Sequence, residues 1–227
     1  MRMKICVPVM ENSVSRVVRS LRLLERHDPD FIEIRFDSMK SPAGFSEIRS
    51  ATERPLIATI RSKGQGGLFR GTEATSLEAL TQAARDGFDY VDVELNTKDA
   101  HTKVHQLKQH GAKVIVSYHN TKLTPTDQAL ESILENEARA GADVCKIVST
   151  ARTYADNLRC LRFLEKHTKE TKLVCFCMGK LGIPSRILSP ILGCYFTFAS
   201  LRSGRETASG QIPIDELRTL YKELGVA

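Results

Sequence analysis

The ten residues "GADVCKIVST" (141–150) place a lysine in the middle of a β-strand. Lys146 stands between the apolar pairs "VC" and "IV", which together have the length and composition of a buried strand. Lysine is almost never fully buried unless its ammonium group is paired. The stretch therefore predicts either a buried ion pair or an amine with a chemical task inside the fold.

Short apolar runs of the same kind recur along the chain. Including the one around Lys146, eight runs have strand length, and several are rich in β-branched or aromatic residues. They occupy residues 3–9, 31–37, 55–61, 90–95, 113–119, 144–149, 172–178 and 195–201. The sequence therefore predicts eight strands.

Helical patterns lie between these runs. Amphipathic segments occupy residues 13–27, 75–87, 124–141, 153–167 and 215–224. Thr75 is the expected N-cap of one helix, because Glu78 follows in capping-box spacing and Gly87 marks an end. Thr124, followed by Pro125, is the expected N-cap of the next helix.

The alternation of strand and helix favours one fold class. Parallel strands need crossover helices, and eight such units close into a (β/α)8 barrel. We therefore expect an α/β TIM barrel in which residues 1–227 form a single domain. An open doubly wound sheet is the alternative. No Gly-x-Gly-x-x-Gly follows the first run, so its dinucleotide-binding version lacks the best support.

The composition is that of an ordinary soluble protein, with 41% apolar and 26% charged residues. No apolar run reaches the roughly 18 residues of a membrane span, and "MRMKICVPV" at the start is interpreted as a strand rather than a signal peptide. The net charge of +6 is spread along the chain, so we expect a solvated basic surface that binds neither nucleic acid nor membrane. These features predict a cytoplasmic protein.

The cysteines and histidines do not form a metal-binding pattern. Disulfide frameworks belong to short secreted chains, so the cysteines are expected to be reduced residues of the core. His101 and His105 are four residues apart on an expected helix, but no acidic ligand pattern accompanies them, and no metal is expected. The six cysteines are Cys6, Cys145, Cys160, Cys175, Cys177 and Cys194.

Charged residues share one face of two predicted strands. Side chains alternate along a strand, so Glu33, Arg35 and Asp37 lie opposite the apolar residues between them. Asp92 and Glu94 alternate with apolar residues in the same way. The apolar faces suit packing against helices, so the charged faces should point into the barrel or its mouth.

Further ionisable residues end or interrupt the other strands. Arg61 and His119 stand at the ends of their runs, and Lys146 lies within its own. Barrels of this class carry their active sites at the C-terminal ends of the strands. Charged groups from at least five strands therefore converge on one mouth, which favours an active site over unrelated ion pairs.

Cations are prominent in this set, because Arg186 beyond the seventh run joins Arg35, Arg61 and Lys146. Arginine binds carboxylates and phosphates with two hydrogen bonds, so an anionic substrate is expected. A lysine in a dry site among arginines favours the neutral amine, which attacks carbonyl groups and forms a Schiff base. His119, one strand away, is the expected proton shuttle.

At these residues the sequence resembles the type I 3-dehydroquinate dehydratases, the Schiff-base dehydroquinases of the shikimate pathway. The resemblance covers essentially the whole chain, and six motifs in order form a specific signal. They are "EIRFD" (33–37), "TIRSKGQGG" (59–67), "SYHN" (117–120), "DVCKI" (143–147), "MGKLGIPSRI" (178–187) and "TASGQI" (207–212).

The resemblance implies a (β/α)8 barrel, usually a homodimer, that needs no metal or cofactor. It implies dehydration of 3-dehydroquinate to 3-dehydroshikimate in aromatic amino acid biosynthesis. Lys146 matches the imine-forming lysine, His119 the general acid–base, and Arg186 the arginine for the substrate carboxylate. The other matched substrate contacts are Glu33, Arg35, Arg61, Thr207 and Gln211, with Met178 and Phe198 as apolar walls.

Three positions depart from the family pattern. Pro8 stands where many relatives carry serine, and Asn120 where aspartate is frequent. Gln65 stands where glutamate is common; its amide oxygen can accept the second N–H of His119 but brings no charge. Glu94 is the alternative partner of His119.

Two other functions remain open. A class I aldolase or transaldolase uses a similar barrel and lysine, with "MGKLG" (178–182) as a phosphate cradle. A non-catalytic basic barrel that binds RNA or a protein is the second alternative. Activity on 3-dehydroquinate, compared with activity on sugar phosphates, separates the two enzymes.

Overall fold

Within residues 2–226, which the computed structural model describes, eight strands alternate with eight α-helices. The strands are β1 (Ile5–Val9), β2 (Phe31–Arg35), β3 (Leu56–Thr59), β4 (Tyr90–Glu94), β5 (Lys113–His119), β6 (Val144–Thr150), β7 (Leu173–Met178) and β8 (Thr197–Phe198). The helices are α1 (Val14–Leu24), α2 (Phe45–Ser50), α3 (Glu73–Arg85), α4 (Ala100–Lys108), α5 (Asp127–Arg139), α6 (Tyr154–His167), α7 (Ile183–Leu188) and α8 (Ile214–Glu223).

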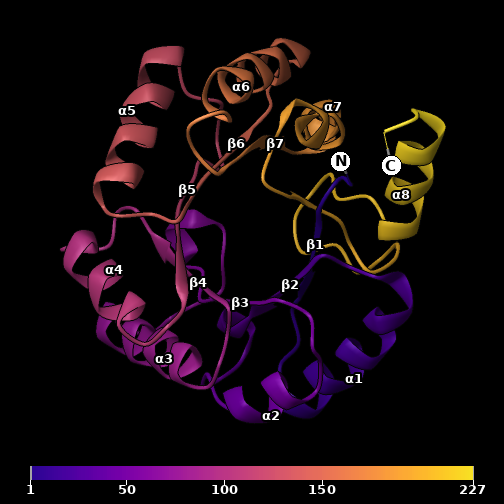
Figure 1. Cartoon of the computed structure of the whole chain (residues 1–227). Helices are drawn as coiled ribbons and strands as arrows, with labels where there is room; N and C mark the ends of the chain where they lie inside the picture. The colour runs from indigo at the N-terminus through magenta and orange to yellow at the C-terminus, as the bar shows by residue number, and fades with distance from the viewer. Residues whose placement is uncertain (1, 227) are drawn as a thin grey trace.

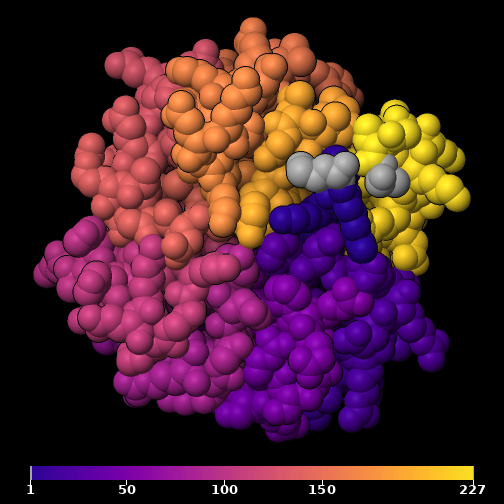
Figure 2. All heavy atoms as spheres, viewed as in Figure 1, coloured from indigo at the N-terminus to yellow at the C-terminus, as the bar shows by residue number. Residues whose placement is uncertain are grey.

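The strands form one parallel sheet that curves into a nearly closed barrel. Their order is β7-β6-β5-β4-β3-β2-β1-β8, so the last strand pairs with the first. The backbone N–H of Tyr195, just before β8, donates to Leu173 of β7 at 2.8 Å and brings the two edges together. Figure 1 shows the helices as a ring around the strands. In Figure 2 the indigo atoms of the N-terminal segment lie against the orange and yellow atoms of the C-terminal segments. The predicted (β/α)8 barrel is confirmed, and the open doubly wound sheet is excluded.

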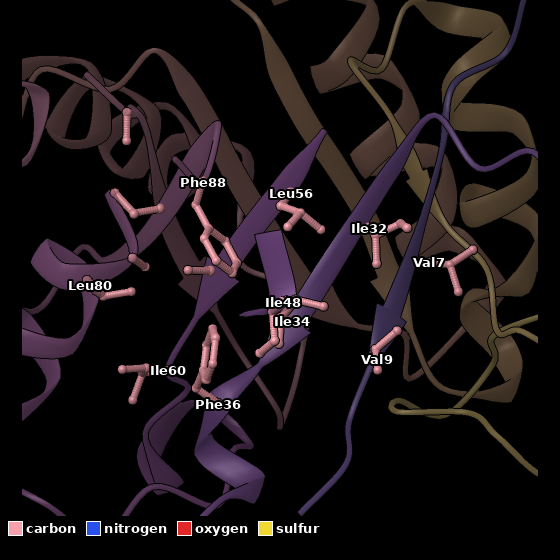
Figure 3. Packing of buried hydrophobic residues seen from close by; sticks show 14 of the residues in the cluster. Val7, Val9, Ile32, Ile34, Phe36, Ile48, Leu56, Ile60, Leu80 and Phe88 are labelled. Carbon is pink, nitrogen blue, oxygen red and sulfur yellow. The ribbon is translucent and has the colours of Figure 1, made fainter. Parts of the chain in front are cut away.

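Apolar side chains fill the layer between the strands and the helices. Ile32 and Ile34 of β2 point into this layer, and Phe36 follows them on the same side. Figure 3 shows Ile34 close to Ile48 of α2, and the ring centroids of Phe36 and Phe88 lie 5.8 Å apart. The outward face of β2 is thus used for packing, which leaves its charged face for the interior.

Large side chains close the N-terminal end of the barrel interior. Phe31 and Tyr90, the first residues of β2 and β4, have ring centroids 5.8 Å apart in an edge-to-face arrangement. The hydroxyl groups of Tyr90 and Tyr195 lie 2.9 Å apart. The polar residues of the same strands lie further along, towards the C-terminal mouth.

Three aspartates fasten the starts of neighbouring strands. Asp30, Asp89 and Asp143 stand directly before β2, β4 and β6. Each carboxylate accepts a backbone N–H at or next to the start of the preceding odd-numbered strand, at 2.8 Å in every case. The donors are Ile5, Leu56 and Val114.

Several predicted boundaries are wrong. The second strand ends at Arg35, and Phe36–Ser38 form a 3-10 turn that carries Asp37. The eighth strand keeps only two residues of the predicted seven. Helices α2 and α7, of six residues each, were not predicted. No helix in the described part of the chain is long and apolar enough to cross a membrane.

Two predicted helix N-caps are also wrong. The N-cap of α3 is Thr72, whose hydroxyl oxygen accepts the backbone N–H of Thr75 at 3.2 Å. The N-cap of α5 is Thr126. Thr124 is buried instead, and its hydroxyl donates to the carbonyl oxygen of Thr150 at 3.1 Å.

Candidate active site

A cavity opens at the C-terminal ends of the strands. It collects side chains from β2, β5, β6, β7 and β8, from the segments after β3 and β5, from α7 and from the loop that precedes α8. All the predicted site residues except Glu94 line it. These are Glu33, Arg35, Arg61, Gln65, His119, Lys146, Met178, Arg186, Phe198, Thr207 and Gln211.

Lys146 extends into this cavity from the middle of β6 and is only 3% exposed. Its Nζ lies 2.9 Å from Asp92 Oδ2, 3.3 Å from Glu33 Oε1 and 4.7 Å from the centre of the Phe198 ring. The amine thus faces two carboxylates inside the barrel.

Gln65 holds the imidazole of His119 in one tautomer. The Gln65 Oε1 atom accepts the backbone N–H of His119 at 2.9 Å and lies 3.1 Å from His119 Nδ1. Gln65 Nε2 donates to Asn96 Oδ1 at 2.7 Å, which fixes the orientation of the amide. An amide oxygen only accepts, so Nδ1 carries the ring proton and Nε2 keeps its lone pair.

The His119 ring is neutral in this environment. Burial, reinforced by the positive charges of Arg61 and Lys146, lowers its pKa well below the usual value, and the opposing charge of Asp92 is a smaller effect. A neutral imidazole with a free Nε2 is a base. The contact with Gln65 is present without any movement of the glycine-rich loop.

Arg61 is neutralised by two carboxylates. Its Nη1 donates to Ser117 Oγ at 2.8 Å and lies 3.3 Å from Glu94 Oε1, while Nη2 lies 2.8 Å from Asp92 Oδ1. That last contact is an ion pair whose geometry does not make a good hydrogen bond. Glu94 also accepts the N–H of Ser62 at 2.8 Å. It is therefore a partner of Arg61 and not of His119.

Arg35 has a carboxylate of its own. Its Nε and Nη2 donate to the two oxygens of Asp37 at 2.8 and 2.7 Å. Asp37 also accepts the backbone N–H of Leu68 at 3.0 Å, and it does not line the cavity. The carboxylate thus links the strand-two arginine to the loop that carries Gln65.

Arg186 differs from the other cations of the site. It is 1% exposed, and Nη1 makes only a long contact of 3.4 Å to the carbonyl oxygen of Phe198. Nε and Nη2 find no hydrogen-bond partner among residues 2–226. The guanidinium lies 4.5 Å from the centre of the Phe176 ring, and desolvation lowers its pKa to about 10. A buried cation with free donors is ready for an anionic ligand.

The loop before α8 contributes Thr207 and Gln211. Gln211 Oε1 accepts the Thr207 backbone N–H at 2.8 Å, and Nε2 donates to Thr207 Oγ1 at 3.2 Å. The carbonyl oxygen of Ser209 accepts the N–H of Gly179 at 3.1 Å, which ties the loop to the end of β7. Gly210 allows this approach, because a Cβ there would meet Gly179 O at 2.5 Å.

The two other departures from the family pattern lie beside the cavity. Pro8 is buried in β1, paired with Glu33 in the sheet, and borders a neighbouring hollow. Asn120 shapes the turn after β5, because its Oδ1 accepts the backbone N–H groups of Lys122 and Leu123 at 3.0 Å.

Some residues of the site were missed or undervalued by sequence reasoning. Asp92 was placed on the correct face, but its position between Arg61 and Lys146 was not predicted. Ser117 connects Arg61 with Asp92, because its hydroxyl group accepts from Arg61 and donates to Asp92 Oδ1 at 2.6 Å. The contact of Phe176 with Arg186 was not predicted, because the sequence indicates only that Phe176 belongs to a strand.

Residues 2–226 contain no group of three or more His, Cys, Asp or Glu side chains that could hold a metal ion.

Comparisons with known proteins agree on one family. Residues 5–227 match the family described as Type I 3-dehydroquinase. The 3-dehydroquinate dehydratase of Methanothermobacter thermautotrophicus is 36% identical over 227 residues, covering 99% of this chain and 98% of that protein. The one of Desulfotalea psychrophila is 35% identical, covering 96% of each. The crystal structure of 3-dehydroquinate dehydratase from Geobacillus kaustophilus superposes with a TM-score of 0.91 at 29% identity, covering 99% of this chain and 92% of that one.

Proposed function

Because the chain belongs to the type I 3-dehydroquinase family, we propose that it dehydrates its substrate through a Schiff base on Lys146, with His119 as general acid and base. The reaction itself is the conversion of 3-dehydroquinate to 3-dehydroshikimate in the shikimate pathway, and the enzyme is a carbon–oxygen hydro-lyase. The observation that carries the mechanism is the buried Lys146 amine, which shares one cavity with the neutral His119 and with Arg186, whose Nε and Nη2 have no hydrogen-bond partner within residues 2–226.

The first steps form the imine. The neutral imidazole takes a proton from the Lys146 ammonium, and the free amine attacks the C3 ketone of the substrate. The imidazolium returns that proton to the hydroxyl group of the carbinolamine, which leaves as water. Asp92 and Glu33, at 2.9 and 3.3 Å from Nζ, stabilise the positive charge of the resulting iminium.

The next steps eliminate the C1 hydroxyl. The iminium draws electrons from the adjacent carbon, so the C2 proton becomes acidic and His119 Nε2 removes it. The same imidazolium then protonates the departing C1 hydroxyl, and a second water molecule results. Hydrolysis of the conjugated iminium releases the enone product and the free lysine.

Arg186 is the proposed partner of the substrate carboxylate. Arg35 and Arg61 already face carboxylates of the protein, whereas the Nε and Nη2 atoms of Arg186 have no such partner in the described residues. A bidentate contact to the carboxylate on C1 would orient the ring with C3 towards Lys146. Thr207 and Gln211, from the loop before α8, would close over the bound substrate and exclude water.

The reaction is tested by mixing the protein with 3-dehydroquinate and following the absorbance of the enone product. The imine is tested by adding borohydride during turnover, which should attach one substrate- or product-derived group irreversibly to Lys146. Lys146→Ala should lose both signals. Mass spectrometry that places the adduct on a different lysine would refute the assignment.

An aldolase is less well supported by the same cavity. In that alternative, residues 178–182 would bind a phosphate through backbone N–H groups. The N–H of Gly179 instead donates to Ser209 O at 3.1 Å, and that of Gly182 to Gly179 O at 3.0 Å. Two donors of the proposed cradle are therefore engaged within the protein. Cleavage of sugar phosphates, without activity on 3-dehydroquinate, would support the aldolase.

We also propose a homodimer, with the whole chain as one catalytic domain. All eight strands belong to one sheet, so no strand is left for a second domain within residues 2–226. Exposed apolar side chains occur on α6, on α7 and on the turn after it: Tyr154, Leu158, Leu188 and Ile191. Light scattering should give twice the chain mass, and Leu158→Lys should shift it towards the monomer. A monomeric wild-type protein would contradict the proposal.

The cytoplasm is the proposed compartment. Every cysteine side chain is buried and free, which suits a reducing environment. Fluorescent tagging or fractionation of the cells that make the protein would test this placement.

A further inference from the structure

Glu137 is a fully buried carboxyl group directly behind the reactive lysine. It lies on α5, which covers β5 and β6 from outside the barrel (Figure 1), and has no exposed surface. Its Oε2 atom accepts the backbone N–H of Lys146 at 3.0 Å. The carboxyl therefore touches the main chain of the residue whose side chain enters the cavity on the other side of the sheet.

The burial of this group is costly. Oε1 finds no hydrogen-bond partner in residues 2–226, and the Cys145 thiol lies beside the carboxyl. Desolvation raises the pKa of Glu137 well above the usual value, against the smaller opposing effect of the Lys146 N–H. A buried acid without a countercharge destabilises a fold, so its presence behind Lys146 calls for a functional reason.

The contact also differs from the other carboxylate contacts to strand N–H groups. Asp30, Asp89 and Asp143 bind donors at or next to the starts of their strands. Glu137 binds the third residue of β6, which is the residue with the amine. Four methylene groups separate the Lys146 backbone from Nζ. If strand pairing alone held this backbone, a small shift of the backbone would move the amine.

We propose that Glu137 is a positioning residue for Lys146: its carboxyl oxygen holds the Lys146 backbone N–H and so fixes the amine relative to Asp92 and Glu33. The inference rests on the proposed Schiff-base function. Displacement of a reacting group by about 1 Å can cost about 10²-fold in rate. The acceptor matters here, not the charge, so a neutral amide should replace the carboxyl.

The test compares Glu137→Gln, which keeps a carbonyl oxygen, with Glu137→Leu, which does not. We expect Glu137→Leu to lower kcat by at least about tenfold, with KM little changed because the binding groups are untouched. The rate of borohydride trapping at Lys146 should fall by the same factor. Glu137→Gln should keep kcat and trapping close to wild type.

Asp143→Ala is the matched control. It removes a carboxylate that accepts a strand N–H, that of Val114, on neighbouring β5. We expect it to lower Tm while kcat per folded molecule stays at the wild-type value. If Glu137→Leu does not fold, Glu137→Met supplies the same comparison with a more adaptable side chain.

Two results would overturn the proposal. One is a wild-type kcat and trapping rate in Glu137→Leu or Glu137→Met. The other is a Glu137→Gln variant as slow as these, because then the charge and not the acceptor would matter. Failure of the wild-type protein to trap 3-dehydroquinate at all would instead refute the Schiff-base function, so the two failures are distinguishable.

Discussion

His119 and Gln65 meet through a neutral hydrogen bond, at the position where the resemblance to the family leads us to expect glutamate. The Gln65 oxygen fixes the tautomer of the ring but does not stabilise an imidazolium. Burial and the nearby cations already lower the His119 pKa. A base acts only above its pKa, so the acidic limb of kcat/KM should lie below the usual histidine range.

Gln65→Glu should move this acidic limb to higher pH. A carboxylate 3.1 Å from Nδ1 would favour the protonated ring, which raises the His119 pKa, and activity then requires a higher pH. The measurement is the pH profile of kcat/KM for both proteins. Glu94→Gln is the control. Glu94 contacts Arg61 and Ser62 rather than His119, so this variant removes no contact of the imidazole and its acidic limb should not shift. Superimposable limbs for wild type and Gln65→Glu would contradict the prediction.

Arg186→Lys should raise KM for 3-dehydroquinate by about tenfold or more, since a hydrogen bond to a charged group is worth about 1.5–3 kcal/mol. Lysine keeps the charge but loses the two-pronged donor. Steady-state kinetics measure the effect. An unchanged KM would assign the substrate carboxylate to another arginine, and Arg61→Lys would then be the variant to examine.

At this scale the sequence identifies residue types better than their pairings. Alternation along β2 and β4 places Glu33 and Asp92 on the inner face, as the structure shows. Which of the cations keeps a carboxylate depends on distances across the barrel between strands remote in sequence. The unpaired state of Arg186 could therefore not be predicted from its motif.

The extent of a helix or strand depends on the residues at its ends as much as on its apolar pattern. The α3 helix begins one turn earlier than its apparent capping box, because Thr72 rather than Thr75 caps it. The two-residue β8 and the six-residue α2 and α7 are too short to show a period. The long helices and the seven longer strands carry enough repeats to be recognised from sequence alone.

Thr72→Ala should destabilise the protein by about 0.5–2 kcal/mol, the usual cost of losing an N-cap side chain. Thr75→Ala keeps the Thr72 hydroxyl oxygen and the backbone N–H of residue 75 that donates to it, so its effect on the free energy of unfolding should be clearly smaller. Urea denaturation of the two variants beside wild type gives both numbers. Equal losses would mean that the Thr72 hydroxyl does not cap the helix.

The fold shields the cysteine thiols from solvent. All six cysteines are buried, and desolvation raises the pKa of Cys194 to about 11, which disfavours the reactive thiolate. An aromatic disulfide reagent should therefore modify none of them in the native protein at neutral pH and all six after unfolding in denaturant. Rapid modification of one thiol in the native state would show that its part of the core opens.

The convergence of charges was the part of the site most accessible to sequence reasoning. Eight βα units imply a closed ring, and a ring brings every strand end to one mouth. The single predicted fold thus explains why residues as distant as Glu33 and Gln211 line one cavity. Contacts in the layer between helices and strands, such as that of Glu137 with Lys146, leave no comparable pattern in the sequence. They depend on how one helix packs on two strands.

The three aspartates that fasten the strand starts divide the barrel into modules. Each binds an N–H of the strand just before its own, so every such contact stays within one βαβ segment. A break in the exposed turn at Gly111, between α4 and β5, would sever none of them. Residues 1–110 would keep Glu33 and Arg61, and residues 111–227 would keep His119, Lys146 and Arg186. Neither piece could turn over substrate alone, so dehydratase activity in a mixture would report docking of two half-barrels into one ring.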